Sequence, residues 1–249
     1  MKISIITVCY NSIKHIENCL ASIKSQNYKD IESILIDGGS TDGTLSLLKS
    51  RNHKFSTLIS EPDKGIYDAM NKGIRHASGD VIGFLNSDDY YVNNEIISKV
   101  ATVFNCNSAI DACYADLIYV DQLNTSKIIR HVKSAQYRKG LFSIGWCAPH
   151  PTFFVRRSVF DRLGNFDLRY KIAPDFDLIM RFLEVNKIKS KYVSEIWVKM
   201  RTGGISNKNL KNIFLQNLEV LSALKKNNIP FSYFRFFYNK LFYILREFL

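Results

Sequence analysis

The sequence predicts an α/β fold with a mixed, mostly parallel sheet flanked by helices, and two features carry this prediction. In the first part of the chain, short apolar runs alternate with stretches of helical periodicity in the order βαβαβαβ. Each apolar run ends in a cluster of polar residues and glycine. Because open α/β sheets bind ligands beyond the carboxyl ends of their strands, we expect the functional site along that edge.

Size and charge limit the class of partner. The 249 residues suit one large α/β domain with an appendage, and 46% hydrophobic residues can form a substantial core. The formal charge of +11 indicates an anionic partner, such as a sugar nucleotide, a nucleic acid or an acidic lipid. No nucleic acid is expected, because neither a zinc-finger spacing nor the aromatic signature of an RNA-recognition sheet is present.

Cysteine usage and hydropathy predict a cytoplasmic protein. The five cysteines are scattered and form no Cys-x-x-Cys pair, which is typical of reduced thiols. The apolar run at the N-terminus is too short for a signal peptide. No uninterrupted apolar span is long enough to cross a bilayer, so any membrane contact is expected to be peripheral.

The first two strand-helix units supply candidate nucleotide-binding segments. Ile3 to Cys9 is predicted to be a strand, and Tyr10-Asn11-Ser12 leads from it into a helix that ends near Gln26. Ile31 to Ile36 is the second strand, and the turn from Asp37 to Gly43 follows it. Glycines beside Asp37 allow backbone to approach a ligand closely. The Gly-x-Gly-x-x-Gly fingerprint is absent, so a Rossmann dehydrogenase is not expected.

A third unit adds a basic residue. Ser56 to Ser60 is predicted to be a strand, and Ile66 to His76 a helix with its apolar residues at helical spacing. Lys64 lies in the intervening loop with Asp63, where it could contact a phosphate; a solvated lysine is the alternative.

The fourth predicted strand, Val81 to Leu85, ends in Asn86-Ser87-Asp88-Asp89. Asp88 and Asp89 are candidate ligands for Mg²⁺ or Mn²⁺, which prefer oxygen donors. A polar turn that caps the next helix is the alternative.

The second half of the chain is expected to complete the sheet with mixed or antiparallel strands. Gly140 to Pro151 has the composition of a mobile loop, in which Trp146 and His150 are candidates for an acceptor pocket; a packed tryptophan and a structural histidine are the alternatives. Pro174-Asp175-Phe176-Asp177 opens a helix. Its acids are explained by capping, but a carboxylate held at a helix start could also serve as a general base.

The C-terminal part reads as a helical extension. A loop from Arg201 to Ser206 could close over a diphosphate and precedes a long helix. From Ile229 onward, aromatic residues are interspersed with Arg and Lys. This composition predicts an interfacial anchor on an anionic membrane, and packing on the domain or on a second copy of the chain is the alternative.

Six short motifs follow one another along the chain. They are Thr7-Val8-Cys9-Tyr10-Asn11, Asp37-Gly38-Gly39-Ser40-Thr41-Asp42-Gly43, the stretch from Asp63 to Gly73, Ala77-Ser78-Gly79-Asp80, Asn86-Ser87-Asp88-Asp89 and Pro174-Asp175-Phe176-Asp177-Leu178. Each motif is weak alone, and the set is specific by its order and spacing. Together they resemble glycosyltransferase family 2, whose fold is the nucleotide-sugar-binding GT-A fold. The resemblance covers roughly residues 1–206, which we take as the transferase domain, with 207–249 as the extension.

The resemblance implies roles for single residues. Thr7, Tyr10, Asn11, Asp37 and Asp63 would hold uracil and ribose, with Lys64 near the phosphates and Asn86 and Ser87 at the ribose. The family's Asp-x-Asp metal motif corresponds to Asn86-Ser87-Asp88, in which the first acid is absent, so Asp88 is the main expected ligand and Asp89 a helper. The family's Glu-Asp base motif corresponds to Pro174-Asp175, and Asp175 would be the base.

The implied reaction is an inverting transfer of one sugar. A UDP-sugar carrying Gal, Glc or GlcNAc would donate to a lipid-linked, undecaprenyl-diphosphate saccharide in O-antigen, lipopolysaccharide or capsule assembly, forming a β-glycosidic bond. The Gln-x-x-Arg-Trp motif of processive synthases is absent, which favours a single addition. The protein would then be peripheral on the inner face of the plasma membrane.

Two other functions remain open from the sequence. A nucleotidyltransferase would also use an α/β sheet, a metal and a nucleotide, but the first strand is not followed by a glycine- and lysine-rich loop. A non-catalytic, membrane-associated scaffold of the same fold is the other alternative, because two motif acids are missing.

Overall fold

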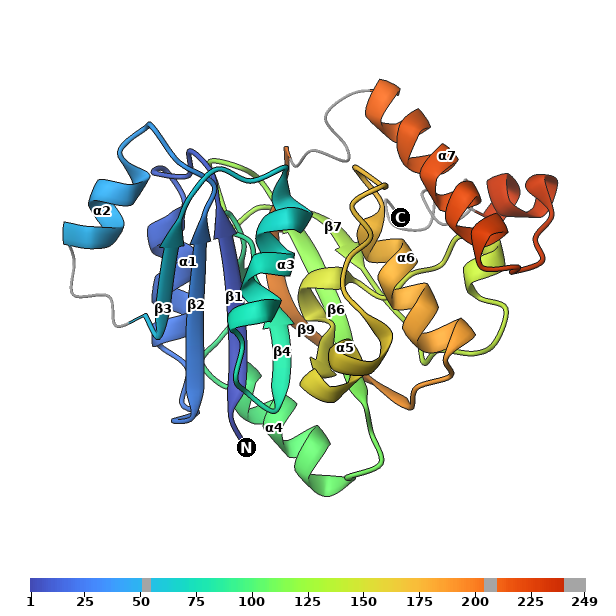
Figure 1. The fold of residues 1–249 in the computed structure, drawn as a ribbon, viewed down its shortest axis with the longest axis horizontal. Coiled ribbons are helices and arrows are strands. Elements are labelled where there is room, and N and C mark those ends of the chain that lie inside the picture. The colour runs from blue at the N-terminus through green and yellow to red at the C-terminus, as the bar shows by residue number, and fades with distance from the viewer. Residues whose placement is uncertain (51–54, 204–209, 240–249) are drawn as a thin grey trace.

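The computed structural model describes residues 1–50, 55–203 and 210–239. Within these residues it forms one nine-stranded mixed sheet of order β3-β2-β1-β4-β8-β6-β9-β5, with β7 paired to β6 (Figure 1). The strands are β1 (Ile3–Cys9), β2 (Ile31–Asp37), β3 (Thr57–Ser60), β4 (Val81–Phe84), β5 (Tyr90–Tyr91), β6 (Ala112–Val120), β7 (Ile128–Val132), β8 (Phe154–Arg156) and β9 (Ser190–Arg201).

Six strands run in one direction and therefore share a carboxyl edge. β1 pairs in parallel with β2 and β4, and β2 pairs in parallel with β3. β8 is antiparallel to both β4 and β6, so β6 and its parallel neighbour β9 run in the same direction as β4. β5, β7 and β8 are the antiparallel strands. This confirms the prediction of a mostly parallel sheet that becomes mixed in its second half.

Helices cover both faces of the sheet (Figure 1). One buried cluster joins β1, β2 and β4 to α3, α5 and α6, and the other joins the opposite face to α1 and α4. The sheet is therefore buried on both faces, which explains the near-continuous apolar runs of β1 and β4. The helices are α1 (Ile16–Lys24), α2 (Thr44–Ser50), α3 (Ile66–His76), α4 (Ile96–Cys106), α5 (Arg157–Leu163), α6 (Pro174–Met180) and α7 (Leu210–Lys226), with short helical turns η1 (Phe142–Ile144), η2 (His150–Thr152) and η3 (Arg181–Val185).

The structure differs from the sequence prediction at several boundaries. α1 begins at Ile16, after an intervening turn, although the helix was expected to follow Ser12 directly; the backbone oxygen of Ser12 accepts the N–H groups of His15 and Ile16 in that turn. β9 is one long strand with a register shift near its middle. The two-residue β5 was not predicted, because it exists only through its pairing with β9.

The C-terminal extension packs on the main core. α7 contacts α6, and Val220, Leu221, Ala223 and Leu224 belong to the same buried cluster as α3 and α6. The domain boundary expected at residue 206 lies outside the described residues. Within the described ranges, every helix is too short or too polar to traverse a bilayer.

Candidate active site

The polar segments singled out from the sequence gather at the carboxyl edge of the sheet. β1, β2, β3, β4 and β9 all end there, so the loops after them are neighbours. α6 continues through η3 toward the start of β9, which lies at the opposite edge. The first turn of α6, with Asp175, is therefore at the carboxyl edge, the same edge as Asp88.

Three segments converge on Gly38. A Cβ added at Gly38 would lie 2.6 Å from an oxygen of Asp63 and 3.4 Å from the ring of Tyr10. Any side chain at this position would therefore displace one of the two. The Tyr10 ring is 63% exposed, which leaves its face open for stacking. Asp63 also accepts the backbone N–H of Gly65 at 2.9 Å.

The Asp37 side chain organises the loop after β2. Its carboxylate is fully buried and accepts hydrogen bonds from the Ser40 backbone and hydroxyl and from the Ser60 hydroxyl at 2.6 Å. Burial alone would raise the pKa of Asp37, but these hydrogen bonds outweigh it and lower the pKa below its usual value. The structure thus places Asp37 inside the loop, beneath the surface that a nucleotide would touch.

Asn11 ties the first loop to the second. It adopts a left-handed conformation (φ 50°), its side-chain oxygen accepts the Thr41 N–H at 2.9 Å, and its own N–H donates to Ser40 at 2.8 Å. The neighbouring Ser12 hydroxyl lies 2.8 Å from that of Ser87. These contacts join the loops after β1, β2 and β4 into one surface.

The segment after β4 is held by the end of β9. Arg201 is 4% exposed, and its guanidinium donates to the Asp88 backbone oxygen at 2.5 Å and lies over the Tyr90 ring at 5.1 Å. His15 lies close enough to be affected, since burial and the charge of Arg201 lower its pKa. A cationic group therefore stands at this end of the site. The sequence indicated Arg201 only as part of a loop that could close over a diphosphate, and nothing in it indicated His15.

The oxygen atoms after β4 fit a hard divalent cation such as Mg²⁺ or Mn²⁺. Asp88 is partly buried, and no ion pair engages its carboxylate within the described part of the chain. The side-chain oxygen of Asn86 and one oxygen of Asp89 are buried there without a hydrogen-bond partner. Residues 1–50, 55–203 and 210–239 contain no group of three or more His, Cys, Asp or Glu suited to a metal. A cation here would need further oxygens from a phosphate ligand, as Mg²⁺ often does.

The two acids of this segment have different environments. Asp89 is 1% exposed, and burial together with the neighbouring Asp88 raises its pKa well above the usual value. Asp88 therefore presents the more accessible charge of the pair.

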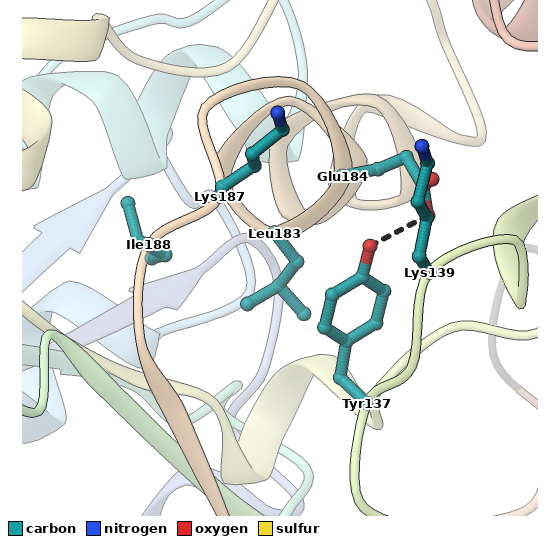
Figure 2. A pocket seen from close by; sticks show the side chains of 6 residues that line it. All are labelled: Tyr137, Lys139, Leu183, Glu184, Lys187 and Ile188. Carbon is teal, nitrogen blue, oxygen red and sulfur yellow. Dashed lines mark hydrogen bonds between the residues drawn. The ribbon is translucent and has the colours of Figure 1, made fainter.

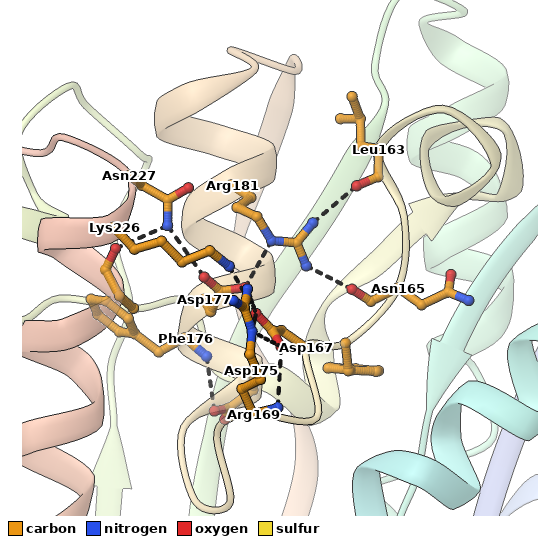
Figure 3. Close-up of polar contacts among 12 residues, drawn as sticks. Leu163, Asn165, Asp167, Arg169, Asp175, Phe176, Asp177, Arg181, Lys226 and Asn227 are labelled. Carbon is orange, nitrogen blue, oxygen red and sulfur yellow. Dashed lines mark hydrogen bonds and ion pairs between the residues drawn. The ribbon is translucent and has the colours of Figure 1, made fainter.

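Asp175 lies at the start of α6 beside α3. Its carboxylate accepts the N–H of Phe176 at 2.8 Å (Figure 3), and the Tyr67 hydroxyl, which donates to the backbone oxygen of Ile172 at 3.4 Å, lies close enough to affect it. Burial raises the pKa of Asp175 to about 6, and hydrogen bonds to its carboxylate limit the rise. A carboxylate with this pKa is ionised at neutral pH and still accepts a proton readily. The sequence did not indicate Tyr67, although it lies within one of the motifs.

Other predicted site residues lie in different surroundings. Thr7 is fully buried on the face of β1 that packs on α1, where it contacts Cys19, so its hydroxyl does not reach the ligand surface. Trp146 is 5% exposed and packs on Tyr114 and Phe142, which makes it a core residue. Lys64 is exposed on the loop before α3, as expected for a side chain that could meet a phosphate.

His150 is packed against the last residue of β4. Its ring stacks on Phe84 at 5.2 Å and meets Phe166 edge-on at 5.5 Å. Burial lowers the pKa of His150 to about 4, so the ring is neutral at physiological pH. Its Nε2 atom has no hydrogen-bond partner among the described residues. The ring is thus a half-buried, uncharged group close to the segment that carries Asp88.

A separate pocket lies away from this edge (Figure 2). It has a volume of about 160 Å³ and is bordered by Ile188, which precedes the start of β9 at the opposite edge of the sheet. Its one carboxylate, Glu184, accepts hydrogen bonds from the Tyr137 hydroxyl at 2.6 Å and the Gly140 N–H at 3.0 Å. Glu184 therefore anchors a loop.

Curated relatives are transferases. Over 180 residues the chain is 32% identical to an uncharacterized glycosyltransferase of Mycobacterium tuberculosis, covering 72% of this chain and 68% of the relative. Over 225 residues it is 30% identical to a PGL/p-HBAD biosynthesis glycosyltransferase of Mycobacterium bovis, covering 89% of this chain and 85% of that protein.

Solved structures share the fold at low identity. TarS 1–349 from S. aureus in complex with UDP-GlcNAc has a TM-score of 0.66 and 19% identity over 90% of this chain and 66% of the other. The chain spans 40% of the longer TarS structure. The mannosyltransferase PcManGT from Pyrobaculum calidifontis, in complex with GDP-Man and Mn²⁺, has a TM-score of 0.61 and 16% identity over 94% and 77% of the two chains. These neighbours agree with the GT-A fold predicted from the motifs.

The family model for glycosyl transferase family 2 matches residues 4–164. That range contains the loops after β1 to β4 and ends before Asp175. With the relatives above, this match decides against the nucleotidyltransferase alternative. The chain belongs to glycosyltransferase family 2.

Proposed function

We propose that the protein is a metal-dependent, inverting glycosyltransferase that moves one sugar from a UDP-sugar to a lipid-diphosphate-linked saccharide in surface polysaccharide biosynthesis, forming a β-glycosidic bond. The observation that supports this proposal is that the exposed Tyr10 ring and the segments that carry Asp88 and Asp175 lie at the same edge of the sheet. An aromatic face, a metal-ligating acid and a proton acceptor are the groups that such a transfer requires.

The residues near Gly38 are suited to binding a nucleotide diphosphate, the carrier part of the sugar donor. The Tyr10 ring can stack on a base, and Asp63 beside Gly38 offers an acceptor for a ribose hydroxyl. Arg201 and the exposed Lys64 add positive charge near the phosphates. TarS, a structural neighbour, was solved with UDP-GlcNAc, which favours a UDP-sugar. Gal, Glc and GlcNAc are the candidate sugars.

The chemistry follows from where charge develops. When bound, Mg²⁺ or Mn²⁺ would neutralise the diphosphate leaving group, with Asp88 as its main protein ligand and Asp89 as a helper. Asp175 removes the proton from the acceptor hydroxyl as that oxygen forms its bond to the anomeric carbon and the bond to the diphosphate breaks. A single displacement inverts the anomeric configuration, so an α-linked donor gives a β-glycoside.

A donor panel tests this function. Purified full-length protein is incubated with Mn²⁺, an undecaprenyl-diphosphate monosaccharide and UDP-Gal, UDP-Glc, UDP-GlcNAc or GDP-Man. Mass spectrometry detects the product, and the proton coupling constant at the new anomeric carbon reports its configuration. Transfer of one sugar from a UDP donor in β linkage is expected. Transfer from GDP-Man alone, or an α product, would contradict the proposal.

The proposal of a lipid-linked acceptor rests on exposed aromatic rings in the C-terminal extension. Residues 233–239 are helical; Phe236 is fully buried and would touch a Cβ at Gly145, whereas Phe234 is 82% and Tyr238 62% exposed. Phe214 on α7 is 64% exposed as well. The extension thus packs on the domain through one side and leaves aromatic rings open. We infer that these rings dock on the inner face of the plasma membrane, where a lipid-linked acceptor would lie. The tail beyond residue 239 lies outside the described residues.

The double variant Phe234→Ser/Tyr238→Ser is expected to lose at least about tenfold in binding to anionic vesicles, because burying each ring contributes about 1.5–3 kcal/mol when it is complete. Vesicle sedimentation measures the partition coefficient. Leu123→Ser is the matched control, since Leu123 is 94% exposed in the turn between β6 and β7. Equal loss in both variants, or none in the first, would speak against membrane docking.

A further inference from the structure

Helix α7 reaches the chain segment that precedes Asp175 through one carboxylate. Glu219 accepts the backbone N–H groups of Lys171 at 2.9 Å, Ile172 at 2.8 Å and Ala173 at 2.9 Å. Ala173 is the residue before α6, and Asp175 is the second residue of that helix. We propose that Glu219 is a positioning residue for the base Asp175. It fixes the backbone of residues 171–173, which leads into α6 and so determines where Asp175 lies. This inference rests on the proposed function.

All three hydrogen bonds of Glu219 go to consecutive residues, 171–173. Three successive N–H groups point at the same carboxylate, so the backbone from residue 171 to 173 has a defined direction as it enters α6. Inside the helix, the N–H of Phe176 is satisfied by Asp175 itself at 2.8 Å. The orientation of the Asp175 carboxylate therefore depends on the first turn of α6, and the position of that turn depends on Glu219.

Contacts that do not involve Glu219 hold α6 in place, so we expect a change at Glu219 to affect only the residues before Asp175. The fully buried Asp177 receives the Arg181 guanidinium at 2.8 Å and the Asn227 side-chain amide at 3.3 Å (Figure 3). Arg181 also donates to the backbone oxygens of Leu163 and Asn165. Removing Glu219 should therefore leave α6 in place while it releases the turn before Asp175.

The groups that face Asp175 come from three elements. The Tyr67 hydroxyl of α3 lies near it and donates to Ile172, Cys147 lies near it from the segment between η1 and η2, and Glu219 approaches from α7. Burial raises the pKa values of both Tyr67 and Cys147, so both are neutral at physiological pH. The charge of Glu219 also raises the pKa of Asp175, although its effect is smaller than that of burial and of the hydrogen bonds to Asp175. Glu219 thus affects both where the base lies and how strongly it takes a proton.

Two variants test the inference. Glu219→Gln keeps the shape and one acceptor oxygen but removes the charge, and Glu219→Ala removes every bond to residues 171–173. We expect Glu219→Gln to lower kcat about tenfold with the donor KM changed less than twofold, and to move the acid limb of the kcat profile at least half a pH unit lower. Glu219→Ala should lower kcat further in the same direction.

Glu184→Gln is the matched control. Glu184 also anchors a loop by accepting a backbone N–H, but it lies at the opposite edge of the sheet. Its variant should change thermal stability without moving the acid limb. Unchanged kcat and acid limb in Glu219→Gln, a change confined to KM, or the same acid-limb shift in both Gln variants would overturn the inference.

A readout without turnover separates this inference from the proposed function. The Asp175 carboxyl carbon is titrated by NMR in wild type and Glu219→Gln, with Asp175→Asn to assign the signal. A lower pKa of Asp175 in Glu219→Gln is expected, and an unchanged pKa overturns the inference. If wild type transfers no sugar to the acceptor while the titration still shifts, the proposed function fails and the contact between Glu219 and the Asp175 segment stands.

Discussion

Asp175→Asn is expected to abolish sugar transfer while UDP binding stays within about twofold of wild type. The amide has nearly the shape of the carboxylate but cannot accept the proton of the acceptor hydroxyl. General-base catalysis contributes about 10²–10⁴-fold, so a loss of about a thousandfold in kcat is expected. Calorimetry measures UDP affinity, and transfer to a lipid-linked acceptor measures kcat. Turnover within about tenfold of wild type would remove Asp175 from the role of base.

The pH dependence of the wild type follows from the same group. The pKa of Asp175 is raised to about 6, chiefly by burial. Because the ionised form is the active base, kcat should fall as the pH drops through about 6, and a pH profile measures this limb. A limb below pH 5 would mean that a different group controls the activity.

The raised pKa of Asp175 also makes the stability of the folded protein depend on pH. The folded state holds the Asp175 proton more tightly than the unfolded chain does, so ionisation of this group disfavours folding above pH 6 and no longer does so below the unfolded pKa near 4. Asp175→Asn should therefore be at least as heat-stable as wild type at pH 7. This separates loss of the base from loss of the fold.

Asp88→Ala is expected to remove the metal-dependent part of UDP affinity. In wild type, Mn²⁺ should tighten UDP binding at least about tenfold, because a bound cation bridges protein oxygens and phosphate. In Asp88→Ala, UDP should bind with the same affinity with and without Mn²⁺, near the metal-free value of wild type. Calorimetry with and without Mn²⁺ measures both.

Asp30→Ala is the control for this variant. Asp30 is an exposed acid that directly precedes β2, so it lies at the opposite edge of the sheet from Asp88. It should keep the metal dependence of UDP binding. Wild-type binding that is indifferent to Mn²⁺ would refute the metal role of Asp88.

The parts of the site that sequence could predict are those written in consecutive residues. Asn86-Ser87-Asp88-Asp89 follows a buried strand, and the structure places that segment at the carboxyl edge as expected. Gly38 was expected to let the backbone approach a ligand, and this stays a prediction; in the structure, Asp63 and Tyr10 lie against it. The place of the segment after β4 was predictable because alternation of apolar and polar segments is a local property of the chain.

Inward-facing polar groups could not be distinguished from ligand-facing ones. Thr7 and Asp37 both occur in motifs, yet both side chains are fully buried. Their direction depends on which face of a strand packs on a helix, and this is decided by β1 and β2 lying between two helical layers. The same holds for Trp146, whose aromatic neighbours come from distant parts of the sequence.

By itself, the sequence determined the order of strands and helices, the parallel start of the sheet and the polar clusters at its carboxyl edge, because hydrophobic periodicity and turn chemistry are local. Only the tertiary structure decided that Arg201 meets Asp88, that Tyr67 meets Asp175 and that Glu219 holds the turn before Asp175. These contacts join residues 46 or more positions apart in the chain. Such contacts form when the whole core packs, and no local pattern encodes them.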